Sequence, residues 1–335
     1  MILTIDGGTT NTRFCIMDNG RLLSAEKLPL GIRDTLTENR TSLFRHGIAE
    51  KIRELIAKYE ASDNGIRACV FSGMITSEAG LYSVPHISVP VGIKELAAQT
   101  ACVMLHDIAP IPFYFIPGVK TYEEIPVPSD AAALMSLDIM RGEETELVGI
   151  MTKLHLTKNG SPHIFLLPGS HMKIVSANGA GQILSFRTAM TGELFRAAAE
   201  HTILTASLDG QLPDTVDAAC LRLGFDCASE NGFAEAAFKV RLIHRCYPST
   251  TPSQRYSFLL GAVLEREIHA VRTADVPVVI AGSQPFRCAL AVLLGDILQP
   301  QHILCVPDNV AEHAAAYGAD AIYHTIHAMS AKDTL

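Results

Sequence analysis

The feature that most limits the fold of this chain is an internal repeat. When the sequence is laid over itself with a shift of 161 residues, the segment 2–24 matches the segment 163–185 without a gap. Apolar runs and two glycine-containing turns recur in the same order, so that Gly8, for example, falls on Gly169. Because a repeat spaced by about a domain length indicates duplicated halves, the sequence predicts two similar domains.

The length and the order of the predicted elements agree with this division. A chain of 335 residues is long for one hydrophobic core. Strands are predicted within 1–30, at 67–71, at 112–116 and at 276–281, and helices at 40–60, 191–201, 253–272 and 309–329. We therefore expect an α/β protein with one domain at 1–155, a second at 156–335 and a cleft between them.

Composition and charge argue against several classes of protein. The formal charge is −8 and no Lys/Arg-rich run is present, so nucleic-acid binding is not expected. The apolar stretch 101–117 is interrupted by His106, Asp107 and two prolines, which argues against a membrane span. Met1 leads directly into a strand, which argues against a secretory leader and for a cytoplasmic protein. Neither the cysteines nor the histidines show zinc-site spacing, so no protein-held zinc is expected.

The first copy of the repeat ends an apolar strand in Asp6 and turns through small and hydroxyl residues into a second strand. Glycines without Cβ let the backbone approach an anion, hydroxyl and amide groups add donors, and Asp6 is placed to hold a divalent cation. Asp-Gly is also an ordinary hairpin turn, and it is the second copy that favours phosphate binding. The predicted phosphate-binding residues here are Gly7, Gly8, Thr9, Thr10 and Asn11.

The second copy keeps the small turn residues and loses the acid, since Asp6 aligns with Leu167. One cation shared between two phosphate hairpins would explain this difference. The strand at 276–281 runs into a Gly-Ser pair, where backbone at a helix start can meet an anion or a nucleoside. The predicted cofactor-binding residues in this half are Gly169, Ser170, Lys173, Gly282 and Ser283.

Between the two copies of the repeat, a short run of glutamates precedes an apolar segment. A helix that begins at Gly142 would place Glu143 and Glu144 in its first turn, where the helix dipole favours carboxylates. Such acids often only cap a helix, but this pair is also the best candidate for a general base.

An arginine fork suits a carboxylate ligand. The predicted substrate-binding residues are Arg13, Arg141, Arg187, Thr191 and Glu193.

Five strings of the chain, in order, closely resemble the 2-dehydro-3-deoxygalactonokinase family, sugar-acid kinases of the actin-like ATPase superfamily. The strings lie at 6–13, 140–145, 167–173, 187–194 and 280–283. The resemblance implies two ribonuclease H-like domains with an interdomain cleft. It also implies ATP- and Mg²⁺-dependent phosphorylation of the 6-hydroxyl of 2-dehydro-3-deoxy-D-galactonate. Because Glu144-Thr145 before an apolar helix resembles the Asp-Thr segment of related sugar kinases, Glu144 is the expected base and Glu143 the reserve.

Alternatives remain open from the sequence. A kinase of a related sugar acid would share these strings, and an exopolyphosphatase-like phosphatase of the same superfamily also uses a Gly-Glu-Glu segment, with the acid activating water. A sugar-sensing regulator would need a DNA-binding module, for which the early strand at 2–6 leaves no room at the N-terminal side. The sequence does not specify the configuration at C4 of the sugar acid, the extent of domain closure or the roles of 119–137 and 210–252. It is compatible with a homodimer but does not specify the oligomeric state.

Overall fold

The computed structural model describes residues 1–32, 38–60, 65–125, 130–209 and 215–331. Its contacts divide the chain into two compact units. Unit 1 comprises 1–161, 178–185 and 313–335, and unit 2 comprises 162–177 and 186–312. Of the two stretches without an assigned role, 119–137 and 210–252, residues 126–129 and 210–214 lie outside the described part.

Unit 1 is built on a six-stranded sheet with the order β3-β2-β1-β4-β7-β6. β2 is antiparallel to its neighbours β1 and β3, β1 is parallel to β4 and β4 to β7, and β6 is antiparallel to β7. The strands are β1 (Ile2–Gly7), β2 (Thr12–Asp18), β3 (Arg21–Leu28), β4 (Cys69–Gly73), β6 (Ala101–Met104) and β7 (Pro112–Phe115). A smaller sheet joins β5 (Ile87–Ser88), β8 (Val119–Lys120) and β9 (Ile139–Met140).

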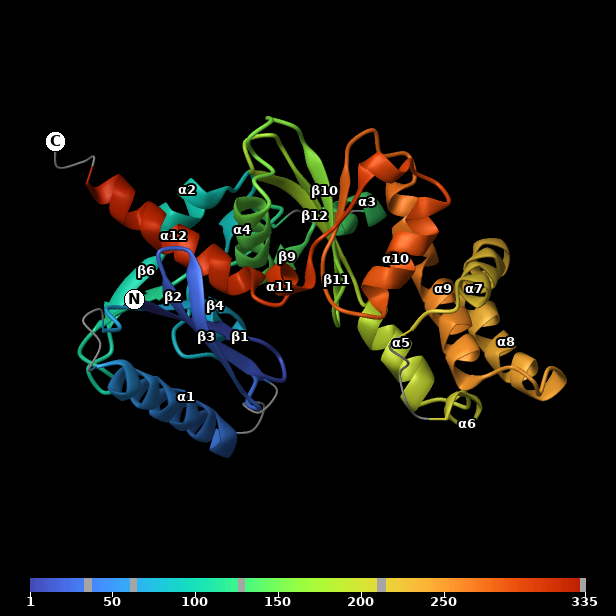
Figure 1. Cartoon of the computed structure of the whole chain (residues 1–335), viewed down its shortest axis with the longest axis horizontal. Coiled ribbons are helices and arrows are strands. Elements are labelled where there is room, and N and C mark those ends of the chain that lie inside the picture. The colour runs from blue at the N-terminus through green and yellow to red at the C-terminus, as the bar shows by residue number, and fades with distance from the viewer. Residues whose placement is uncertain (33–37, 61–64, 126–129, 210–214, 332–335) are drawn as a thin grey trace. The chain divides into compact units, whose positions relative to one another are not determined.

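Helices cover both faces of this sheet because its central strands β1 and β4 are apolar on both sides. Ile48 and Ile52 of α1 (Glu38–Tyr59) share a buried cluster with Leu3 and Ile5 of β1. The other face contacts α12 (Ala314–Ser330), so that α1 and α12 lie on opposite sides of the sheet (Figure 1). The remaining helices of unit 1 are α2 (Ile93–Gln99), α3 (Ala131–Met135), α4 (Glu143–Lys153) and the 3-10 turn η2 (Met74–Thr76).

Unit 2 repeats the strand order of unit 1. Its sheet runs β12-β11-β10-β13-β14, and β10 is antiparallel to β11 and parallel to β13, just as β1 pairs with β2 and β4. The prediction of two similar halves is therefore confirmed at the level of topology. The strands are β10 (His163–Leu167), β11 (Met172–Ala177), β12 (Ile183–Ala189), β13 (Val278–Ile280) and β14 (Ile303–Cys305).

The helices of unit 2 pack around a second apolar core, in which Leu166 and Ile280 of the sheet meet Phe258 and Leu264 of α9. The 210–252 stretch supplies the pair α7 and α8, which packs on α9. The helices are α5 (Thr191–Glu200), α6 (Thr205–Leu208), α7 (Ala218–Asn231), α8 (Phe233–Cys246), α9 (Pro252–Val271), α10 (Phe286–Gly295) and α11 (Asp308–Ala311), with the 3-10 turn η3 (Pro300–His302).

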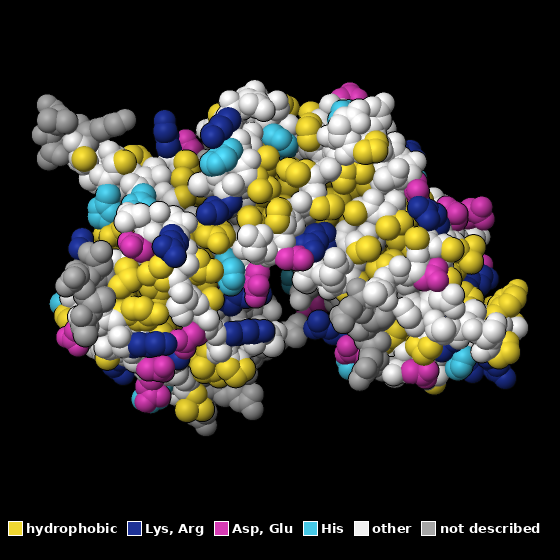
Figure 2. Space-filling model, viewed as in Figure 1, with side chains coloured by type: hydrophobic (Ala, Val, Ile, Leu, Met, Phe, Trp, Pro, Cys, Tyr) yellow, Lys and Arg dark blue, Asp and Glu magenta, His cyan; other side chains and the backbone are white. Residues whose placement is uncertain are grey.

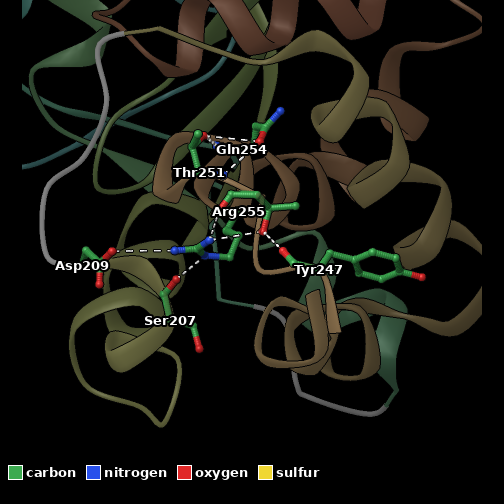
Figure 3. Close-up of polar contacts among 7 residues, drawn as sticks. Ser207, Asp209, Tyr247, Thr251, Gln254 and Arg255 are labelled. Atoms are coloured by element: carbon green, nitrogen blue, oxygen red, sulfur yellow. Dashed lines mark hydrogen bonds and ion pairs between the residues drawn. The ribbon is translucent and has the colours of Figure 1, made fainter. Parts of the chain in front are cut away.

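The start of α9 is fixed by a buried arginine (Figure 3). Arg255 is 3% exposed and donates through Nε to the Ser207 carbonyl and through Nη1 to the Thr250 carbonyl. Its Nη2 lies 3.7 Å from Asp209 Oδ2. Thr251 and Gln254 close a capping box, in which each side chain accepts the backbone N–H of the other. These contacts tie the end of α6 and the α8–α9 connection to α9.

The chain end differs from the sequence prediction. The single helix predicted at 309–329 is two helices, α11 in unit 2 and α12 in unit 1, because the backbone leaves helical geometry at His313 (φ −119°, ψ 17°). The division at 155/156, drawn from the repeat, stays a prediction about domains. The compact units differ from it because α12 packs against α2 and α4.

Two surface properties bear on partners. Within the described residues, no helix is both long and apolar enough to span a bilayer. On the face shown in Figure 2, Lys and Arg side chains are interspersed with Asp and Glu side chains and do not gather into one basic stripe.

Candidate active site

In unit 1, the first hairpin turn follows Asp6 at the end of β1. Asp6 pairs with Arg13 across the ladder, and Arg13 Nη1 lies 3.8 Å from Asp6 Oδ2. The Gly8 N–H donates to the Asn11 carbonyl at 2.9 Å and closes the turn, in which Thr10 is exposed. The Asp6 side chain is 25% exposed. The Asp6 carboxylate and the turn at 8–11 thus lie at the same end of β1.

The structure adds a packing reason for Gly7. A Cβ at this position would lie 2.5 Å from Ile75 Cβ in η2. Similarly, a Cβ at Gly73, whose φ is +77°, would lie 2.8 Å from Asp6 Oδ1. Glycine at these two positions lets β1, β4 and η2 meet closely around the Asp6 carboxylate.

Three acids of the first turn of α4 join this region. The helix begins after Gly142, as predicted, and Glu144 is fully buried. The Gly142 N–H donates to both Glu144 oxygens, at 3.0 and 2.8 Å, and Thr145 Oγ1 donates to Glu144 Oε1 at 3.1 Å. Burial, and then the negative charge of Glu143, raise the pKa of Glu144 to about 7 against the opposing effect of these bonds.

Glu146 is a site residue that the sequence analysis missed. Burial raises its pKa to about 8, the charges of Glu143 and Asp6 add to the shift, and Arg13 opposes it. The pKa of Asp6 is also raised by burial, against Arg13 and with a contribution from Glu143. Asp6, Glu143 and Glu146 therefore form one electrostatic cluster, which we call the acid cluster. Its signal in the sequence is the spacing of three between Glu143 and Glu146, which places both on one helix side.

The acid cluster fits a magnesium ion that is held mainly by phosphates. Among the described residues, no three His, Cys, Asp or Glu side chains are arranged as a metal-binding set. Mg²⁺ commonly takes one or two carboxylates and fills its octahedron with water and substrate phosphates. Asp6, partly exposed beside the hairpin turn, is suited to be that carboxylate, and a cation there would relieve the repulsion between Asp6 and Glu143.

Arg141, predicted to bind substrate, has structural partners. Its Nη1 donates to the Thr76 carbonyl and hydroxyl at 2.9 and 2.6 Å, and its Nη2 donates to the Val84 carbonyl at 2.8 Å. Nη2 also lies 3.2 Å from His86 Nδ1. Burial, and then Arg141 itself, lower the pKa of His86 to about 4, so the neutral ring can accept this bond. Arg141 thus anchors the segment at 76–86.

In unit 2, the second hairpin turn lies between β10 and β11. Lys173 is buried, 5% exposed, and Nζ donates to Thr188 Oγ1 at 2.7 Å, so this strand lysine is held inside the unit and not solvated. Gly169 and Ser170 form the turn, and Arg187 is exposed on β12. Gly169, Ser170 and Lys173 thus lie at the same end of the β10–β11 hairpin.

The start of α5 packs directly on this turn. A Cβ at Gly192 would lie 2.0 Å from the Gly169 carbonyl oxygen, and the Glu193 N–H donates to the Ser170 carbonyl at 2.9 Å. Glu193 also pairs with His171 at 3.5 Å. The Thr191-Gly192-Glu193 string therefore shapes the turn, and two of its members, predicted to bind substrate, have partners within the protein.

The predicted nucleoside residues lie beside the same hairpin. Gly282 has a φ of +76°, and a Cβ there would lie 2.6 Å from Pro168 Cγ. The Ala281 N–H donates to the Leu166 carbonyl at 2.9 Å, which continues the pairing of β13 with β10. Ser283 follows, and its carbonyl accepts the Arg287 N–H at 3.2 Å. A side chain at Gly282 would therefore disturb the hairpin itself.

Comparison with known proteins identifies one family. The model of the family described as 2-keto-3-deoxy-galactonokinase matches residues 6–312. The 2-dehydro-3-deoxygalactonokinase of Escherichia coli (strain K12) is 26% identical over 276 residues, 81% of this chain and 80% of that protein. A protein of Rhizobium meliloti (strain 1021), named a probable 2-dehydro-3-deoxygalactonokinase, is 26% identical over 203 residues, 60% of this chain and 57% of that protein.

Solved structures share the fold. A Sinorhizobium meliloti protein described as a candidate 2-dehydro-3-deoxygalactonokinase superposes with a TM-score of 0.76 at 24% identity, covering 97% of this chain and 99% of that one. The activator of the 2-hydroxyisocaproyl-CoA dehydratase from Clostridium difficile, with bound ADPNP, superposes with a TM-score of 0.51 at 13% identity. The match covers 100% of this chain and 97% of that one. At these identities the likeness concerns the fold alone. With the repeated strand order, it confirms the predicted α/β class of two ribonuclease H-like, actin-like domains.

Proposed function

Since the chain belongs to the 2-keto-3-deoxy-galactonokinase family, and is therefore a kinase, we propose that its acceptor is the 6-hydroxyl of 2-dehydro-3-deoxy-D-galactonate. The products are 2-dehydro-3-deoxy-6-phosphogalactonate and ADP. The family match over residues 6–312 carries this proposal. The hairpin with Asp6 and the acid cluster support it, because phosphoryl transfer needs charge neutralisation and positioning more than covalent chemistry.

The nucleotide would be bound by backbone and small side chains. The first turn at 8–11 would contribute N–H and hydroxyl donors. The second turn would contribute Gly169 and Ser170, and Lys173 lies buried in the strand that follows it. Gly282 and Ser283 border the nucleoside. Asp6 would hold Mg²⁺, which would offset the negative charge of the phosphates.

Glu143 is the better candidate for the base. A general base must reach the hydroxyl proton that it accepts, and the Glu144 carboxylate is fully buried with bonds from Gly142 and Thr145. Glu143 is only half-buried and interacts electrostatically with Asp6, and the Arg141 N–H donates to its Oε2 at 3.1 Å. We assign the base to Glu143 and give Glu144 the role of holding the start of α4.

Two amide variants separate these roles. Glu143→Gln keeps the size of the side chain and removes the charge, so it should reduce kcat by about 100-fold or more while ATP binding changes little. Glu144→Gln should keep most of the turnover. A large loss in Glu144→Gln with little loss in Glu143→Gln would return the base to Glu144, and normal turnover in both would place it elsewhere.

For the acceptor, the arginines on the exposed surface are the candidates. Arg13 is 53% exposed and Arg187 is exposed, so both can offer a guanidinium fork to a carboxylate. Arg141 is left out because its donors are occupied by Thr76 and Val84. We expect the reaction in the cytoplasm, where ATP is available.

The substrate is tested with a panel of 2-keto-3-deoxy sugar acids that includes both C4 epimers. ADP release is followed by a coupled assay, with Asp6→Asn as the inactive control. The galacto epimer should give the highest kcat/KM. Preference for another acid would make the chain a kinase of that acid, and hydrolysis of ATP or polyphosphate that needs no acid would favour an exopolyphosphatase-like enzyme.

A further inference from the structure

A buried carboxyl group lies behind the helix that contacts the second hairpin of unit 2. Glu267 of α9 is 5% exposed, and Thr191 donates its hydroxyl hydrogen to Glu267 Oε1. The other oxygen, Oε2, is buried and has no hydrogen-bond partner within the described residues. Burial raises the pKa of Glu267, and the bond from Thr191 opposes this shift. A buried carboxyl group with an unpaired oxygen costs folding free energy, so a role that offsets this cost is expected.

The partner of Glu267 is the first residue of the helix that shapes the hairpin turn. Thr191 begins α5, and the next two residues make the contacts with the turn: Gly192 against the Gly169 carbonyl, and the Glu193 N–H to the Ser170 carbonyl. A shift of Thr191 would therefore move both contacts together.

The helix that carries Glu267 is a fixed support. α9 is 20 residues long, is anchored at its start by Arg255, and packs on α5, α7 and α8. Leu264 and Ile268, which lie close to Glu267 on this helix, are fully buried in the core of unit 2. Glu267 thus joins a rigid core element to the start of α5.

We propose that Glu267 is a positioning residue of the nucleotide site. Through the Thr191 hydroxyl it holds the start of α5 against the second hairpin, so that the turn at 168–171 keeps the shape that receives the terminal phosphate. The inference rests on the proposed function, because it requires that this turn binds ATP. Glu267 itself does not touch the nucleotide.

The test compares variants on both sides of the Thr191–Glu267 bond. Glu267→Leu and Thr191→Val remove the acceptor and the donor, and Glu267→Gln and Thr191→Ser conserve them, since an amide oxygen can accept and serine can donate. Glu265→Gln is the matched control, because Glu265 lies on the same helix but pairs with His269 at 3.1 Å. Kd for ATP and for adenosine is measured by calorimetry on the full chain without sugar acid, followed by kcat and both KM values.

Glu267→Leu and Thr191→Val should each weaken ATP binding about tenfold. Adenosine binding should stay within about twofold of wild type in both variants, as should the KM of the sugar acid in Glu267→Leu and every constant of the Glu265→Gln control. The two conservative variants should stay near wild type for ATP, and the double variant Glu267→Leu/Thr191→Val should be no worse than either single variant, because the two share one bond.

Wild-type ATP affinity in both Glu267→Leu and Thr191→Val would overturn the positioning role, as would a Glu267→Gln variant no better than Glu267→Leu. A failure of the proposed function looks different. In that case the wild-type chain itself binds no ATP or phosphorylates no sugar acid, and the inference falls with it.

Discussion

At the scale of single residues, the site depends on acids that are close together and only partly hydrated. Burial, together with the charge of Glu143, raises the pKa values of Asp6 and Glu146. Carboxyl groups with a raised pKa are disfavoured as free anions and favoured beside a cation. The sequence identified Asp6 and Glu143 from their motifs. It could not predict burial of Glu144 or the contribution of Glu146, because both depend on how α4 packs.

Asp6→Asn tests both the cation-binding role of Asp6 and the cost of its buried charge to folding stability. The change should lower kcat by about 100-fold or more, because charge neutralisation carries much of phosphoryl transfer. Because burial raises the pKa of Asp6 in the folded state, the ionised form disfavours folding at neutral pH, and the variant should melt no lower than wild type. Kinetics at saturating magnesium and a thermal melt measure both effects.

The control for this variant is Asp18→Asn, which removes an acid from the far end of β2 and should leave turnover unchanged. A variant at Asp6 with near-native turnover would contradict the assignment. So would equal losses at Asp6 and Asp18.

The buried Glu144 predicts a pH dependence of stability. Its pKa is raised from 4.5 to about 7, so the folded state binds this proton more tightly than the unfolded chain does. The corresponding stability is present below about pH 4.5, is lost as pH rises towards about 7, and stays lost above it. Glu146 acts in the same direction up to about pH 8. The free energy of unfolding should therefore fall across this range.

Denaturant unfolding of the nucleotide-free protein at several pH values measures this fall. In Glu144→Gln it should be smaller by about 3 kcal/mol. A wild-type stability that is flat or rises between pH 4.5 and 8 would show that Glu144 stays ionised at little cost.

At the scale of elements, glycines decide which helices can approach each other. A Cβ at Gly149 of α4 would lie 1.9 Å from the Ala314 carbonyl oxygen of α12, and one at Gly318 would lie 1.8 Å from the Thr145 carbonyl oxygen of α4. Gly149 and Gly318 thus allow α4 and α12 to pack closely. α4 is the helix that carries the acids, so this packing supports the site.

Gly149→Ala should destabilise the protein by about 2 kcal/mol or more, because the added methyl group can be accommodated only if α4 and α12 separate. The matched control is Gly295→Ala at the end of α10, where a Cβ would meet nothing within 4 Å. This control should be neutral or slightly stabilising, because alanine favours a helix over glycine. Unfolding midpoints that change equally in the two variants would contradict the close packing of α4 on α12.

Strands and amphipathic helices could largely be predicted from the sequence because their periodicity is local. The predicted helix at 253–272 is α9 at Pro252–Val271, and the helix at 191–201 is α5 at Thr191–Glu200. The break between α11 and α12 could not be predicted, because the alanine-rich sequence there favours a continuous helix and the interruption depends on which unit each part packs in.

At the scale of the whole molecule, one topology occurs twice. The repeat in the sequence predicted this, because its turns and strands recur in order. The five strands of the unit 2 sheet follow the same order as β3, β2, β1, β4 and β7 in unit 1. The return of α12 to unit 1 could not be predicted, since no local pattern tells a helix which sheet it will cover. The second hairpin has lost the acid that corresponds to Asp6. Asp6 is therefore the central residue of the proposed reaction.

The most direct test of the central claim is the identity of the phosphorylated product. The chain is incubated with ATP, Mg²⁺ and 2-dehydro-3-deoxy-D-galactonate, and the mixture is followed by ³¹P NMR with proton coupling. Transfer to the 6-hydroxyl predicts one new phosphate monoester signal, split into a triplet by the two protons on C6, that grows in step with ADP and is absent with Asp6→Asn. Growth of orthophosphate alone, or a doublet from an ester at a secondary hydroxyl, would contradict the account.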